Sequence, residues 1–125
     1  MNRSDARLRL ASLALIAAAG VAAAWHAAHA GLSFDGAMNM QVPLALVQHG
    51  RYASTYDRMT DFPPALQTGP TLLLPVAGFF AAFGASPLVA QIPNLLYLVL
   101  GLVLVWSLVR RLASEAAGFL AVGVV

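Results

Sequence analysis

The sequence has 125 residues, of which 60% are hydrophobic and 10% are charged. Soluble domains carry roughly 25% charged and 45–50% apolar residues, so this composition indicates a membrane protein. All seven cations are arginines, and their small excess lies at two sites instead of along one face, which excludes nucleic-acid binding. Because the chain has no cysteine, disulfide frameworks, thiol catalysis and cysteine-based metal sites are excluded as well.

The first predicted element is an apolar span over residues 8–28, which follows three arginines in the opening segment MNRSDARLR. At about 1.5 Å per residue, this stretch is long enough to cross a hydrocarbon core of about 30 Å. A signal peptide is the alternative, because AHA at 28–30 fits the A-x-A cleavage pattern. The opening arginines place the N-terminus in the cytoplasm by the positive-inside rule.

A polar segment, residues 29–86, follows and is expected to lie outside the cytoplasm with two short helices in it. Helical spacing of apolar residues predicts the first helix over 36–49, with a bend at Pro43 and an end at Gly50. The second apolar helix, 71–84, is short for a span, so we expect it at the membrane interface. A true short span is the alternative.

The second complete span is predicted over 87–109, and it ends at Arg110 and Arg111. If 71–84 lies at the interface, this span runs inward and the arginine pair faces the cytoplasm, as the positive-inside rule prefers. The stretch between the two short helices, RYASTYDRMTDFPP at 51–64, is typical of a loop.

A third span is expected to begin over 115–125, where the sequence stops inside an apolar run about half the length of a span. We therefore expect the N-terminal part of a larger protein, inactive by itself. The expected fold is an all-α, polytopic membrane helix bundle with a long outer loop that carries juxtamembrane helices.

Several features occur in a particular order along the chain. A basic start and a single span are followed by an acid near the outer end of the span, Asp35, and then by a helix ending in QHGRY (48–52). TGPTLLLP (68–75) opens the next apolar helix, and RRLAS (110–114) follows the second span. This order resembles the N-terminal module of the GT-C superfamily of polytopic glycosyltransferases, which includes protein mannosyltransferases and bacterial aminoarabinose transferases. Relatives usually carry an Asp-Glu pair, whereas here Gly36 takes the second place.

The resemblance implies transfer of a sugar from a polyprenyl-phosphate donor to an acceptor at the outer membrane face. It also implies that Asp35 acts at the reacting centre, where a carboxylate serves as general base for the acceptor hydroxyl. The expected partners are a lipid-linked sugar donor and membrane lipid. The resemblance places the protein in the bacterial inner membrane as a multi-pass protein. Members differ in metal use, so a divalent metal stays possible as cofactor, although no residue spacing here specifies a metal site.

The leaving phosphate needs cationic or hydrogen-bonding groups, and the first N–H groups of the 71–84 helix are one source. The candidate side chains for donor binding are Arg51, Arg58, Gln67 and Thr68. The charged candidates also have plainer interpretations. The arginines are ordinary loop cations, and Asp35 is the N-cap of the following helix.

A non-enzymatic membrane protein or transporter fragment is the alternative function. Transporter sites usually lie near the bilayer midplane, on broken helices or intramembrane charges. Here the polar residues inside the spans are uncharged: Ser12, Gln91, Asn94 and Ser107. Most of the ionisable groups outside the two chain ends lie in residues 29–86 instead, and this distribution favours chemistry at the membrane surface.

Overall fold

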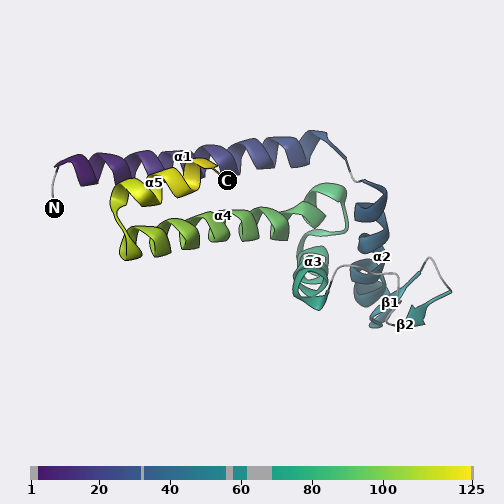
Figure 1. Ribbon diagram of the computed structural model, residues 1–125. Helices are drawn as coiled ribbons and strands as arrows, with labels where there is room; N and C mark the ends of the chain where they lie inside the picture. Colours follow the sequence, from purple (N-terminus) through teal and green to yellow (C-terminus); the bar gives the residue numbers. More distant parts are fainter. Residues whose placement is uncertain (1–2, 32, 56–57, 62–68, 125) are drawn as a thin grey trace. The chain divides into compact units, whose positions relative to one another are not determined.

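The structure is a computed structural model, and it describes residues 3–31, 33–55, 58–61 and 69–124. Within these ranges the elements follow in chain order (Figure 1): α1 (Arg3–His29), α2 (Phe34–His49), β1 (Ala53–Ser54), β2 (Thr60–Asp61), α3 (Pro70–Phe83), α4 (Pro87–Leu112) and α5 (Glu115–Val124). The described chain is therefore mostly helical, as predicted.

The chain divides into two compact units. Unit 1 consists of Met1–His26 and Leu95–Val125, and unit 2 consists of Ala27–Asn94. Most of α1 and α4 belongs to unit 1 together with α5. Unit 2 holds α2, the β1–β2 hairpin, α3 and the first residues of α4.

Two helices, α1 and α4, are long and apolar enough to cross a membrane. In their most apolar windows, only 11% of α1 and 17% of α4 is buried inside the protein. A core helix of a soluble protein would be mostly buried, whereas these helices present apolar side chains outward, which is stable in lipid and costly in water. Length, composition and exposure together favour a membrane protein.

The core of unit 1 joins residues from three helices. Ile16 of α1 packs with Leu102 and Trp106 of α4 and with Val122 of α5, and all four side chains are buried. Gly118 lets α5 approach α4 closely, because a Cβ atom there would lie 3.1 Å from Trp106 Cδ1 and 3.0 Å from Arg110 Cβ.

An ionic cluster of Arg9, Arg110 and Glu115 lies in the same unit. Arg9 Nε donates to Glu115 Oε1 at 2.7 Å, and Arg110 Nη1 lies 3.7 Å from the same oxygen. The Arg110 guanidinium also stacks over the Trp106 ring, 4.4 Å from its centroid. The Glu115 side chain is only 14% exposed. Because it contacts both arginines, this one acid links the start of α1 to the end of α4.

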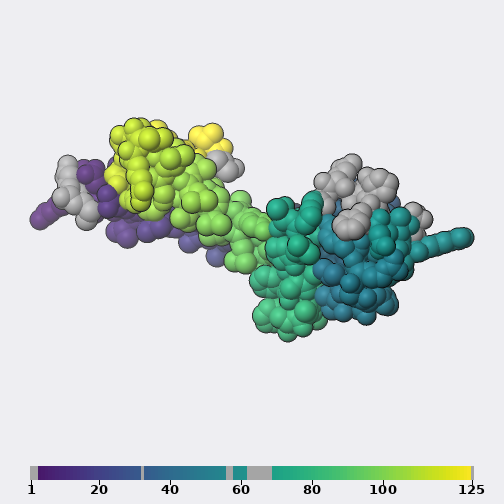
Figure 2. All heavy atoms as spheres, turned by 90° about the horizontal axis from the view of Figure 1, so that it is seen from below, coloured from purple at the N-terminus to yellow at the C-terminus, as the bar shows by residue number. Residues whose placement is uncertain are grey.

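Unit 2 is built on the contact between α2 and α3 (Figure 2). Its core contains Val76 and Phe80 of α3 and Ala90 of α4, with Met40 of α2 packed against them. The α2 helix continues through Pro43, whose ring is buried beside Val42. This packing offsets part of the cost of the backbone hydrogen bond that proline cannot make.

Most helix ends lie within a few residues of their predicted positions. The α2 helix begins at Phe34, two residues before the predicted start, and ends where Gly50 takes a left-handed φ of 67° and donates its N–H to Leu46 O. Proline opens α3 in its first turn, and α4 continues three residues past 109, so that it includes Arg110 and Arg111. The α1 helix begins at Arg3 instead of residue 8.

The prediction of loop throughout 51–64 is wrong for two short segments. The strands β1 and β2 pair antiparallel, with Ala53 opposite Asp61 and Ser54 opposite Thr60. Arg58 and Met59 adopt left-handed φ angles of 48° and 63°, which turn the chain back without a glycine. Strands of two residues leave no alternating pattern, so the sequence carried no signal for them.

Candidate functional site

Ser33, and not Asp35, is the N-cap of α2. The Ser33 hydroxyl oxygen accepts a hydrogen bond from the Gly36 N–H at 3.1 Å, and its carbonyl accepts from the Ala37 N–H at 2.9 Å. The interpretation of Asp35 as the cap is therefore wrong. The serine was overlooked because the predicted helix began at residue 36, which put Asp35 at the cap position.

Asp35 lies in the first turn of α2 and is exposed. Its carboxylate makes neither a hydrogen bond nor an ion pair with any described residue. The positive end of the helix dipole stabilises a negative charge at this position, and this effect needs no direct contact with the carboxylate. Its oxygens are therefore open to a ligand from outside the helix.

The position of Asp35 follows from the short connection between α1 and α2. The α1 helix ends at His29, Gly31 takes a left-handed φ of 67°, and α2 begins at Phe34. The acid is therefore six positions past the end of a candidate span, against seven for the predicted span 8–28. In a membrane, this spacing keeps the carboxylate close to the lipid surface.

Asn39 is a polar neighbour that sequence analysis did not assign to the site. It is four positions after Asp35 and half-buried, on the same face of α2. The i, i+4 spacing was the available signal. The Asn39 amide offers both a donor and an acceptor one helical turn from the carboxylate.

Arg51 is engaged within the hairpin region. Its Nη2 atom lies 2.8 and 2.9 Å from the two carboxylate oxygens of Asp61 and 3.3 Å from Met59 O. The hydrogen bond with Asp61, and then its charge, raise the pKa of Arg51 above its ordinary value. The contacts tie the residue after α2 to the second strand, which favours the plainer interpretation of Arg51 as a loop cation.

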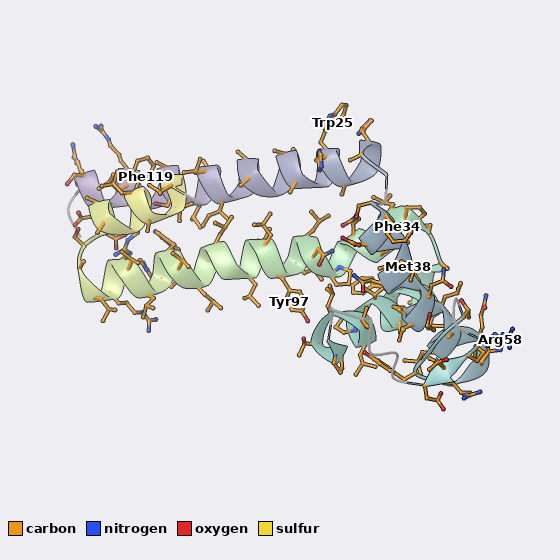
Figure 3. The ribbon with its side chains drawn as sticks, turned by 45° about the vertical axis from the view of Figure 1, so that its right-hand side comes forward. Trp25, Phe34, Met38, Arg58, Tyr97 and Phe119 are labelled. Atoms are coloured by element: carbon orange, nitrogen blue, oxygen red, sulfur yellow. The ribbon has the colours of Figure 1, made fainter. Side chains whose placement is uncertain are left out.

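The α2 helix separates the predicted base from the predicted phosphate-binding arginines. Asp35 and His49 are fourteen helical positions apart, or about 21 Å. Arg51 follows the far end of α2, and Figure 3 shows Arg58 on the hairpin, at the opposite end of α2 from Phe34. The reacting carbon and the phosphate of a sugar donor are directly bonded, so these groups do not surround one reacting centre in this structure.

The start of α3 offers fewer free N–H groups than the sequence suggested. Pro70 has no N–H, and the N–H groups of Leu72 and Leu73 both donate to Gly69 O at 3.2 Å. Gly69 provides no side-chain cap. The first turn is therefore largely satisfied from within. Gln67 and Thr68, the other two predicted donor-binding residues, lie outside the described residues.

No group of three or more His, Cys, Asp or Glu side chains in the described ranges is placed to hold a metal ion. Partial burial raises the pKa of the Tyr52 phenol, which lies beside the hairpin.

The described site consists of one free carboxylate at the start of α2 and one arginine–aspartate pair at its other end. Comparisons with family models, with curated proteins and with solved structures found no match to this chain.

Proposed function

We propose that this chain is part of an integral-membrane glycosyltransferase of the GT-C type. It transfers a sugar from a polyprenyl-phosphate donor to an acceptor hydroxyl at the extracytoplasmic face. One observation carries the proposal: the first turn of the helix after a candidate span holds an exposed carboxylate, Asp35, that neither caps the helix nor pairs with another described residue.

Asp35 acts as the general base. As the acceptor oxygen bonds to the anomeric carbon, its proton passes to an Asp35 carboxylate oxygen. The bond between the anomeric carbon and the donor phosphate oxygen breaks, and the phosphate leaves with the electron pair. A positioned base of this kind typically contributes about 10²–10⁴-fold to the rate. An exposed carboxylate without a partner can accept that proton without first losing another contact.

The leaving phosphate is stabilised by groups other than Arg51 and Arg58, which lie at the far end of α2. Gln67 and Thr68 remain proposed donor-binding residues. Arg51 and Arg58 are left out because Asp35 is about 21 Å along α2 from His49, the end of the helix near the two arginines.

The protein is oriented with its N-terminus in the cytoplasm and unit 2 outside. Five of the seven arginines belong to the start of α1 and the end of α4, and the positive-inside rule places such ends in the cytoplasm. Single cysteines in the full-length protein test this, with any other accessible cysteines removed. Suitable positions are Ala85 and Ala113, which are exposed and avoid the left-handed Gly84 and the capping Ser114. An impermeant thiol reagent on intact cells should label Ala85→Cys alone, and labelling of Ala113→Cys alone would reverse the orientation.

The catalytic proposal is tested with Asp35→Asn in the full-length protein, using a lipid-linked sugar donor. We expect the rate of transfer to fall by about 10²–10⁴-fold, with unchanged protein level in the membrane. Asp61→Asn is the matched control, because it removes an exposed carboxylate of the same unit at the other end of α2. Near-normal transfer by Asp35→Asn, or equal loss in both variants, would remove Asp35 from the mechanism.

A further inference from the structure

Unit 1 carries most of the positive charge of the protein at one end. Arg3, Arg7 and Arg9 lie in the first turns of α1, and Arg110 and Arg111 lie in the last turn of α4. Both ends are adjacent, because Arg9 and Arg110 contact the same carboxylate of Glu115. Figure 3 shows nitrogen-tipped side chains projecting from these two ends.

The charges at this end do not balance. Five arginines face two acids, Asp5 and Glu115, which leaves a formal excess of three positive charges against a net charge of +2 for the whole chain. Glu115 is already engaged by Arg9 and Arg110. The side chains of Arg3, Arg7 and Arg111 are exposed and make no ion pair or hydrogen bond with any other described residue.

The position of the α1 arginines runs against local helix electrostatics. Positive side chains are unfavourable at a helix N-terminus, where the dipole is positive and free N–H groups point outward. In α1 only Asp5 has the favoured sign. An anion at this end would be attracted both by the guanidinium groups and by the helix terminus, so the unfavourable placement becomes favourable once an anion is bound.

The same arginines lie just outside the apolar stretches of both candidate spans. No charged residue occurs between Arg9 and Asp35, nor between Asp61 and Arg110. When α1 and α4 cross a bilayer, these side chains are at the depth of the lipid phosphates. Guanidinium groups bind phosphate oxygens through paired, charge-assisted hydrogen bonds.

We propose that this arginine end, Arg3, Arg7, Arg9, Arg110 and Arg111, binds the headgroups of anionic phospholipids in the membrane leaflet that surrounds it. Glu115 has a positioning role, because it holds Arg9 and Arg110 together despite their like charge. The inference requires α1 and α4 to cross the membrane but does not depend on the chemistry of Asp35.

The test measures phospholipid retained by purified full-length protein in a neutral detergent with phosphatidylglycerol or phosphatidylcholine added. We expect the wild-type protein to retain phosphatidylglycerol preferentially, and salt to weaken that retention. Arg7→Gln with Arg111→Gln should lower retention by about 25-fold, because each basic residue near an anionic surface contributes about fivefold. Arg58→Gln is the control, since it removes an exposed arginine of unit 2 and should change nothing.

Three results would overturn the proposal: equal retention of the two lipids, equal retention by all three proteins, or displacement of phosphatidylglycerol by inorganic phosphate well beyond the effect of chloride at the same ionic strength. The last result would indicate a site for soluble anions. If the double variant fails to fold, Arg3→Gln with Arg7→Gln serves instead, because both side chains are exposed in the first turns of α1. Asp35→Asn should retain lipid normally, so failure here is distinguishable from failure of the sugar-transfer proposal.

Discussion

Arg9 and Glu115 are 106 positions apart in the sequence, and the Arg9 Nε atom lies 2.7 Å from Glu115 Oε1. The contact joins the first helix of the chain to the last described one. Arg110 approaches the same oxygen from α4, so a single carboxylate contacts guanidinium groups from two helices. The start of α1 is therefore held beside the connection between α4 and α5, which lies about a hundred residues later in the sequence.

Glu115→Gln should destabilise the protein by about 1–3 kcal/mol. Removing one partner of a fully buried ion pair costs about 3–5 kcal/mol, and the partial exposure of Arg9 reduces that cost. Thermal unfolding in detergent measures the change, with Arg111→Gln as the control, because Arg111 is exposed and beside the cluster. Equal melting temperatures for wild-type protein and Glu115→Gln would show that the cluster contributes nothing to stability.

Gly118→Ala should destabilise the packing of α5 on α4. The added Cβ would lie 3.0 Å from Arg110 Cβ, 3.1 Å from Trp106 Cδ1 and 3.3 Å from Trp106 O, which forces side chains or backbone to move. We expect a loss of about 1–3 kcal/mol. The matched control is Gly101→Ala in α4, where nothing lies within 4 Å of the new atom. There alanine should be neutral or slightly stabilising, because it favours helix more than glycine does. The same loss at both positions would contradict close packing at Gly118.

Ser33→Ala should separate capping from catalysis. Loss of the hydroxyl removes the bond to the Gly36 N–H and costs about 1 kcal/mol of stability. Sugar transfer by the folded Ser33→Ala protein should stay within a few fold of wild type, whereas Asp35→Asn should show the reverse pattern. Melting curves and transfer assays on both variants check this, and a rate loss in Ser33→Ala as large as in Asp35→Asn would mean that α2 geometry limits the rate.

Met59→Gly should stabilise the hairpin. Met59 has a φ of 63°, a conformation that costs about 1–2 kcal/mol for a residue with a Cβ atom and little for glycine. Part of that gain is lost because glycine is more flexible in the unfolded chain. We expect a net gain of up to about 1 kcal/mol in thermal unfolding. Met38→Gly in the second turn of α2 is the control and should be destabilising by about 1 kcal/mol. A destabilised Met59→Gly protein would contradict the left-handed turn.

The helices were predictable because several of their ends are marked by glycine or proline, the residues most typical of helix ends. Gly50 ends α2 in the left-handed region, and Pro70 and Pro87 open α3 and α4. The apolar lengths of α1 and α4 were visible as unbroken runs. In contrast, the hairpin depends on the pairing of two strands of only two residues each. A strand of this length has no recognisable sequence pattern of its own.

The site was predictable only in part. Asp35 is distinctive in sequence because it is the first charge after a long apolar run, and the structure leaves it exposed. The distance between Asp35 and the arginines depends on α2 being a continuous helix through Pro43, where a bend was expected. The Glu115 cluster was missed because Glu115 was interpreted only as the start of a third span. Arginines next to both spans were the available signal, since they meet if both spans end on one side.

The length of α2 also has a practical consequence. The turn at Arg58 and Met59 is exposed or half-exposed and follows α2 in the chain, and the C-terminal end of α2, His49, is about 21 Å along the helix from Asp35. Exposed loop tips tolerate insertions well. A short epitope or fluorophore-binding tag between Arg58 and Met59 should therefore report the location of unit 2 in living cells while the start of α2 keeps its conformation.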